Sequence, residues 1–141
     1  MMRYVDTSVL VAALTREAQT ARMQNWLAGQ AAGALAISMW VITEFSTALS
    51  IKLRTGDIDA AHRANALAAF ALLCDESFTI LGLSALNFRA AALFADQAQV
   101  GLRASDALHL AVCAEHGGEL CTLDRRLGGA GPALGVKTTL L

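Results

Sequence analysis

Short apolar runs alternate with longer helical stretches along this chain, and that alternation limits its possible folds more than any other feature. The runs have the length and residue types of buried strands. They lie at 2–6, 34–38, 78–83, 119–123 and 136–141. Strands that alternate with helices form βαβ units, so we expect a mostly parallel sheet covered by helices on both faces.

Helices are predicted in the segments between these runs, at 8–17, 19–29, 39–56, 57–76, 85–100 and 105–118. Gly29 and Gly56 stand at helix C-terminal ends, where glycine is favoured. Ser84 is placed to cap the helix that follows it. The acids that open 57–76 suit the positive end of a helix dipole.

The chain has 141 residues, which fits a single domain over 1–141. Hydrophobic residues make up 55% and charged residues 16%, so a core is easily built and a buried protein interface is expected. No apolar run approaches the ~18 residues of a membrane span. Asp6 interrupts the start before the apolar region of a signal peptide forms, so we expect a cytoplasmic protein without membrane contact.

The cysteines and the net charge exclude two classes of site. Cys74, Cys113 and Cys121 lie in apolar surroundings and show no CxxC or Cys/His metal spacing. We interpret them as reduced core thiols rather than zinc ligands. The formal net charge of −1 lacks the basic excess typical of nucleic-acid-binding domains, so any such contact must rely on a local patch.

The stretch "YVDTSVL" at 4–10 places an acid where a buried strand becomes a helix. Asp6 either caps that helix or belongs to a site at the end of the strand, and the two roles are compatible. Asp124 follows "ELCTL" in the same way, although it also fits a turn or cap residue paired weakly with Arg125 or Arg126. In parallel sheets the functional crevice lies at the carboxyl ends of strands, where both acids are expected.

Two further acids are predicted on helices. Glu44 shares an apolar stripe with Val41 and Phe45, so it either reaches the rim of the core or points into a polar pocket. Asp106 follows Ser105 at a helix start, where the serine would cap and the aspartate would favour the helix dipole. Both helices can pack beside the strand ends that carry the other two acids.

These four acids together predict a metal site. Carboxylates without histidine or cysteine suit a hard cation such as Mg²⁺ or Mn²⁺. Mg²⁺ keeps several waters and leaves positions for phosphate oxygens. A cation held in this way activates water and stabilises the leaving group of a phosphodiester.

Four short motifs then resemble a known family. "YVDTSVL" resembles the opening motif of PIN-domain ribonucleases, "VITEF" their helical glutamate, "ASDALHLA" their third motif and "TLDRRL" their fourth acid. Their order and spacing, from residue 4 to about 127, are similar to VapC-type toxins of bacterial toxin–antitoxin pairs. The resemblance implies a three-layer α/β/α PIN-like fold with a mostly parallel sheet of about five strands. It also implies RNA cleavage dependent on Mg²⁺ or Mn²⁺, a homodimer, and inhibition by an antitoxin whose tail enters the site.

The resemblance assigns roles to individual residues. The metal-binding and catalytic acids fall on Asp6, Glu44, Asp106 and Asp124. The hydroxyl neighbours fall on Thr7, Ser8, Ser105 and Thr122. Candidate RNA contacts near the mouth of the site are Arg103, Arg125, Arg126 and Lys52. The two arginines of "DRRL" either bind phosphate or neutralise the acid beside them.

Other residues are expected to be structural. His62, His109 and His116 are lone helical histidines without a matching serine or cysteine nucleophile, and we assign them no catalytic role. Trp40 and Phe45 are expected in the core or at a dimer interface.

Two alternatives to a nuclease remain. The first is a phosphotransferase of the haloacid-dehalogenase type with Asp6 as nucleophile, but such enzymes usually carry a second aspartate where this chain has Ser8. The second is a PIN-like scaffold that only binds partners. The presence of all four acids argues against a scaffold.

Overall fold

A five-stranded parallel sheet forms the centre of the protein, whose computed structural model describes residues 1–141. The strand order is β3-β2-β1-β4-β5, and every neighbouring pair is parallel. The strands are β1 (Arg3–Val5), β2 (Leu35–Ser38), β3 (Thr79–Leu81), β4 (Glu119–Thr122) and β5 (Thr138–Leu140). The predicted parallel sheet is therefore confirmed.

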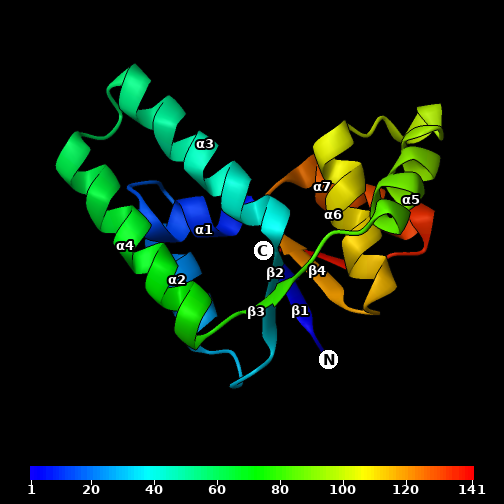
Figure 1. The fold of residues 1–141 in the computed structure, drawn as a ribbon, viewed down its shortest axis with the longest axis horizontal. Helices are drawn as coiled ribbons and strands as arrows, with labels where there is room; N and C mark the ends of the chain where they lie inside the picture. The colour runs from blue at the N-terminus through cyan, green and yellow to red at the C-terminus, as the bar shows by residue number, and fades with distance from the viewer.

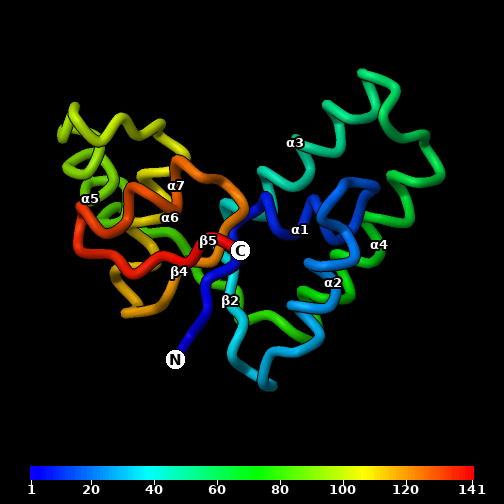
Figure 2. Tube along the Cα trace, turned by 180° about the vertical axis from the view of Figure 1, so that it is seen from behind, coloured from blue at the N-terminus to red at the C-terminus, as the bar shows by residue number.

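Seven α-helices cover the two faces of the sheet. They are α1 (Thr7–Leu14), α2 (Thr20–Ala28), α3 (Met39–Thr55), α4 (Ala60–Glu76), α5 (Ala85–Ala95), α6 (Ala104–Glu115) and α7 (Arg125–Ala130), with short 3-10 helices η1 (Ala98–Val100) and η2 (Pro132–Leu134). Figure 1 shows α1 to α4 on one side of the sheet and α5 to α7 on the other, and Figure 2 shows the same division from behind. This confirms the predicted three-layer α/β/α PIN-like fold.

The strand order reverses between β1 and β4. The chain runs outward from β1 to β2 and β3, then returns to β4 and β5 on the opposite side of β1. Right-handed crossovers in opposite directions place their helices on opposite faces, which explains the two helical layers. At such a reversal the loops after the two central strands run in opposite directions, and we call the space at the carboxyl ends of β1 and β4 the crevice. β1 and β4 stay paired up to that point, because the Asp6 N–H donates to the Cys121 carbonyl (3.0 Å).

The core binds both helical layers to the sheet. Tyr4 and Ile37, on neighbouring strands, are fully buried, and Phe45 of α3 packs on Phe70 of α4 with ring centroids 4.2 Å apart. Small side chains allow α5 and α6 to approach closely on the other face; they include Ala91, Ala107 and Ala111. The crevice is therefore framed by elements with little freedom to move.

Several predicted helix bounds differ from the structure: α1 ends three residues earlier than predicted and α5 five residues earlier. α4 begins three residues later than predicted, because Asp59 caps it by accepting the His62 N–H (2.7 Å). A short helix, α7, replaces the polar turn predicted after β4. Asp124 starts α7 by accepting N–H groups, and Leu127 and Ala130 anchor it by turning into the core.

The cysteines carry free thiols, as predicted. Cys113 and Cys121 are buried and Cys74 is half-buried. Burial, reinforced by nearby negative charge, raises the pKa of Cys113 to about 12 and of Cys121 to about 11. None of the helices combines the length and the apolar character needed to cross a bilayer.

Candidate metal centre

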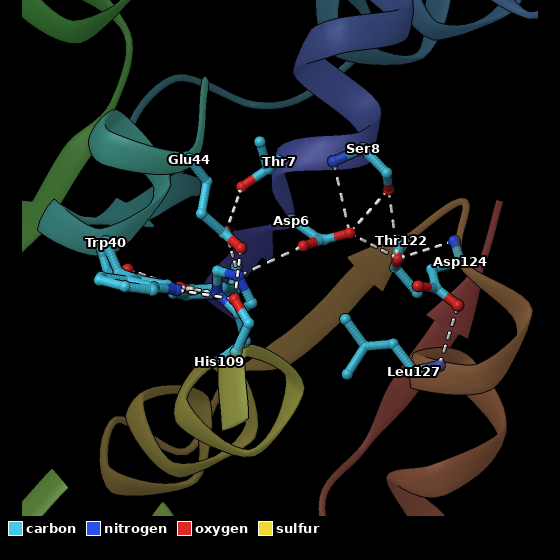
Figure 3. Close-up of polar contacts among 12 residues, drawn as sticks. Asp6, Thr7, Ser8, Trp40, Glu44, His109, Thr122, Asp124 and Leu127 are labelled. Atoms are coloured by element: carbon cyan, nitrogen blue, oxygen red, sulfur yellow. Dashed lines mark hydrogen bonds and ion pairs between the residues drawn. The ribbon is translucent and has the colours of Figure 1, made fainter. Parts of the chain in front are cut away.

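Asp6 both caps a helix and faces the crevice. Its Oδ2 accepts hydrogen bonds from the Ser8 N–H (3.4 Å), the Ser8 hydroxyl (2.7 Å) and the Thr122 hydroxyl (2.8 Å). No hydrogen bond reaches its Oδ1, which lies 3.6 Å from Nε2 of His109 (Figure 3). The carboxylate is thus held by one oxygen and presents the other to the crevice.

Glu44 reaches the same place from the second turn of α3. Its Oε1 accepts from the Thr7 hydroxyl (2.7 Å) and lies 2.5 Å from Nε2 of His109. Its Oε2 accepts from the Ser105 hydroxyl, whose oxygen accepts the Trp40 indole N–H (2.8 Å). Burial acts to raise the pKa of Glu44, but the hydrogen bond and electrostatic attraction of His109, together with the hydroxyl donors, outweigh burial and lower the pKa to about 2. Glu44 is therefore ionised at neutral pH.

His109 lies between the two acids, one turn after Asp106 on α6, and is only 2% exposed. Burial acts to lower its pKa, but the hydrogen bond to Glu44 and the charges of Asp6, Glu44 and Asp106 raise the pKa overall. Its Nδ1 is hydrogen-bonded to the Tyr4 hydroxyl (2.7 Å), and burial raises the pKa of that hydroxyl far above its usual range.

From the sequence we expected no catalytic role for His109, but the structure places it between Asp6 and Glu44. The signal that could have found it is its position three residues after Asp106, which places both on one helix face. Every residue of α6 from Asp106 to Cys113 is buried, so these two polar side chains need partners. Ligand atoms of Asp6, Glu44 and His109 all lie within 4.8 Å of one another.

Asp106 lies beside this cluster rather than inside it. Its Oδ2 accepts the Arg103 N–H (3.3 Å), and Arg103, not Ser105 as predicted, occupies the N-cap position of α6. Burial raises the pKa of Asp106, and the charges of Asp124 and Asp6 raise it further against the opposing effect of Arg103. The carboxylate is therefore near enough to those two acids for mutual repulsion.

Asp124 lies at the outer edge of the centre as the N-cap of α7. Its Oδ1 accepts from the N–H groups of Arg126 (2.8 Å) and Leu127 (3.3 Å). Its own N–H donates to the Thr122 hydroxyl oxygen (2.9 Å), and that hydroxyl donates to Asp6. One hydroxyl thus connects the acids that follow the two central strands.

The sequence matches the family model of the PIN domain over residues 3–130. The chain belongs to the PIN domain family. No curated protein gives a significant match.

Solved structures share the fold of this PIN domain. FitAcB from Neisseria gonorrhoeae is similar with a TM-score of 0.72 and 18% identity, covering 97% of this chain and 96% of that one. VapC20 from Mycobacterium tuberculosis, a Sarcin-Ricin loop cleaving toxin, has a TM-score of 0.72 and 21% identity, covering 92% and 95%. VapBC2 from Rickettsia felis, bound to a DNA fragment from its promoter, has a TM-score of 0.68 and 17% identity, covering 99% and 98%.

The basic side chains near the mouth of the PIN domain's crevice are free of ion pairs. Arg103, Arg125 and Arg126 are exposed at the starts of α6 and α7, and no salt bridge involves them. They therefore do not neutralise Asp124 by direct pairing. Lys52, near the far end of α3, instead pairs with Glu17 (3.5 Å).

The donor set of this PIN domain fits a divalent cation. Carboxylate oxygens are the ligands that Mg²⁺ and Mn²⁺ prefer, and Oδ1 of Asp6 accepts no hydrogen bond from the protein. Burial is the main cause of the raised pKa of Asp106, and the negative charges of Asp124 and Asp6 add to it. A cation in the crevice would balance these charges.

Proposed function

We propose that this PIN domain is an endoribonuclease dependent on Mg²⁺ or Mn²⁺ and the toxin of a bacterial toxin–antitoxin pair. The observation that carries the proposal is the convergence of the Asp6 and Glu44 carboxylates at the strand-order reversal, with ligand atoms within 4.8 Å. Family membership supports nuclease activity. The toxin role is supported by the similar fold of VapC20 and of the VapBC2 proteins.

The four acids of the centre would contribute unequally to binding a cation. Asp6 and Glu44 would hold it most directly, with Asp106 beside them and Asp124 at the edge. When bound, such a cation supplies water activation and charge stabilisation at the phosphodiester. Ser8 and Thr122 fix the Asp6 carboxylate, and the Glu44 carboxylate is likewise fixed by hydroxyl donors, namely Thr7 and Ser105.

RNA would approach across the starts of α6 and α7. Arg103, Arg125 and Arg126 stand there without competing carboxylate partners, so their guanidinium groups are available to phosphate. Contacts of this kind position a backbone without reading its sequence. This local patch would compensate for the lack of overall positive charge.

A cognate antitoxin would place a basic side chain among the acids, because arginine binds carboxylates through two hydrogen bonds. The antitoxin would also cover apolar surface of the toxin.

The proposed homodimer is supported by large apolar side chains exposed on α5: Leu86 (66%), Phe88 (55%) and Leu93 (68%). The free thiols support a reducing compartment such as the cytoplasm, and we propose that residues 1–141 act as one domain.

The two alternatives are weaker. A phosphotransferase would use Asp6 as nucleophile, but membership of the PIN family and Ser8 at the place of the second aspartate argue against it. A binding scaffold would need no cation, so it does not account for the convergence of the Asp6 and Glu44 carboxylates.

The test is RNA cleavage by purified protein on total bacterial RNA, with new 5′ ends mapped by sequencing. Cleavage is expected with Mg²⁺ or Mn²⁺ and should stop with EDTA. The Asp6→Asn variant should lose it. Asp75→Asn, which neutralises an exposed acid on α4, is the matched control and should cleave like the wild type. Equal cleavage by Asp6→Asn and wild type would refute the assignment, and an inactive wild type that binds no Mn²⁺ would favour a scaffold.

A further inference from the structure

A buried hydrogen-bond network of Ser38, Tyr4 and His109 ends on Glu44. The Ser38 Oγ lies 2.7 Å from the Tyr4 hydroxyl, which lies 2.7 Å from Nδ1 of His109. Nε2 of His109 then lies 2.5 Å from Oε1 of Glu44. Ser38, Tyr4 and His109 are at most 2% exposed, so water does not reach the bonds among these three residues.

The network is anchored at the centre of the sheet. Tyr4 belongs to β1 and Ser38 ends β2, and these strands pair at the centre of the sheet. The Tyr4 and His109 rings pack edge to face, with centroids 5.7 Å apart. Glu44 comes from α3 in one helical layer and His109 from α6 in the other (Figure 3). The network therefore connects the sheet to both layers at the point where the acid is held.

The bonds have one self-consistent direction when the imidazole is neutral. Ser38 donates to Tyr4, Tyr4 donates to Nδ1, and Nε2–H donates to Glu44. Each hydroxyl has one proton and each is used, so no buried donor lacks a partner. Donors aligned in one direction polarise one another, which strengthens the last bond to the carboxylate.

The same geometry argues against His109 as a metal ligand. Its Nε2 is directed at Oε1 of Glu44, while Oδ1 of Asp6 is farther away at 3.6 Å. Oε1 accepts from both Thr7 and His109, so its two lone pairs are used, whereas Ser105 takes one of the two on Oε2. An oxygen with a free lone pair then remains on Glu44 and another on Asp6.

We propose that Ser38, Tyr4 and His109 are positioning residues that orient the Glu44 carboxylate for a divalent cation, without binding the cation themselves. The inference rests on the proposed function, because it assumes that Glu44 is a ligand. Partners of metal ligands commonly change metal affinity by about 10–100-fold when they are removed. A network that only stabilised the fold would leave the affinity of the folded protein unchanged.

The first test measures Mn²⁺ affinity by titration calorimetry and by the signal of free Mn²⁺ in electron paramagnetic resonance. His109→Leu should weaken binding by about 10–100-fold, and Tyr4→Phe by about tenfold. His109→Gln should restore affinity to within about threefold of wild type, because its amide N–H can donate to Glu44 as the imidazole does. Thr15→Val is the matched control; it removes a buried hydroxyl bonded to the Val11 carbonyl (2.6 Å), far from Glu44, and should leave affinity unchanged.

If His109→Leu does not fold, Ser38→Ala is a second variant that breaks the network. It should also weaken Mn²⁺ binding. The second test is spectroscopic. Pulsed electron paramagnetic resonance of the Mn²⁺-loaded protein, with and without ¹⁵N-labelled histidine, should show no directly coordinated imidazole nitrogen.

The outcomes separate this inference from the proposed function. A coordinated nitrogen lost in His109→Gln would make His109 a ligand and overturn the positioning role. Wild-type affinity in His109→Leu and Tyr4→Phe would overturn it too, while Mn²⁺ binding by the wild type would leave the proposed function standing. A wild type that binds no Mn²⁺ would refute both.

Discussion

The two sides of the metal centre differ in what holds their carboxylates. On one side Glu44 receives donors from side chains on other elements, 37, 61 and 65 residues away in the sequence. On the other side Asp106 and Asp124 accept backbone N–H groups within three residues of themselves. The pKa values diverge accordingly: Glu44 is lowered to about 2, while Asp106 is raised.

This difference shows two ways of keeping acids together. On the Glu44 side the protein itself stabilises the charge, because Thr7, Ser105 and His109 all donate hydrogen bonds to the carboxylate. On the Asp106 side the nearby negative charges repel one another, and the exposed arginines make no direct ion pair with them. Unbalanced like charges lower stability until a cation binds, and they also make that cation bind more tightly.

The largest expected effect is on RNA cleavage, where the two sides should behave alike. Glu44→Gln and Asp106→Asn should each lower kcat/KM by about 10²–10³-fold, as removal of one electrostatic stabiliser does in other enzymes. Initial rates with saturating Mn²⁺ measure this, with Asp75→Asn as the matched control. If Asp106→Asn cleaves at the wild-type rate, the Asp106 side serves only to start a helix.

The second prediction concerns metal-dependent stability. Mn²⁺ at a hundred times its dissociation constant should stabilise the wild type by about 2.7 kcal/mol, which corresponds to a rise in Tm of roughly 8 °C for a domain of this size. Asp106→Asn should lose most of this rise, because the charge that the cation balances has gone. Thermal melts with EDTA and with Mn²⁺ measure both, and an undiminished rise in Asp106→Asn would place the cation away from that residue.

The third prediction separates the two sides by the sign of a stability change in EDTA at pH 7. Glu44 has a lowered pKa, so its charge stabilises the fold above about 4.5, and this stability is lost as the pH falls towards 2. Glu44→Gln should therefore cost about 2 kcal/mol at pH 7, a figure reduced for the partial exposure of the side chain. Asp106 has a raised pKa, so its charge is unfavourable at pH 7 and Asp106→Asn should be as stable as wild type or more so.

Urea unfolding of both variants at pH 7 and at pH 4 measures these signs. The advantage of Asp106→Asn should shrink at the lower pH, because the wild-type carboxyl then takes up a proton. Destabilisation by Asp106→Asn at pH 7 would contradict the assignment of unbalanced charge to that side.

Local patterns in the sequence were enough for the fold and for part of the centre. The alternation of strands and helices predicted the parallel sheet, and strand-end position placed Asp6 and Asp124 near one edge. The cap roles of those two acids were also foreseen, because capping depends only on neighbouring residues. The helix α7 could not be predicted in this way, because its formation also depends on the burial of Leu127 in the core.

The role of His109 could not be predicted from neighbours. Its partners Glu44 and Tyr4 lie 65 and 105 residues away in the sequence, and only the folded layers bring them together. The same holds for Ser105, which was expected to cap a helix but instead donates to Glu44. The roles that were predicted least well are therefore those of the residues around Glu44, whose contacts come from distant parts of the sequence.

The smallest expected effect concerns Asp124, where cap and ligand roles can be separated. Its Oδ1 accepts two N–H groups of α7, so Asp124→Ala should cost about 1 kcal/mol of stability. Asn caps nearly as well as Asp, so Asp124→Asn should unfold like the wild type in urea while removing the charge. Because this residue is half-buried at the rim, loss of its charge should lower cleavage by no more than about tenfold, less than at the other acids. A hundredfold loss in Asp124→Asn with unchanged stability would make Asp124 a ligand, and the cap of α7 would then be only its second role.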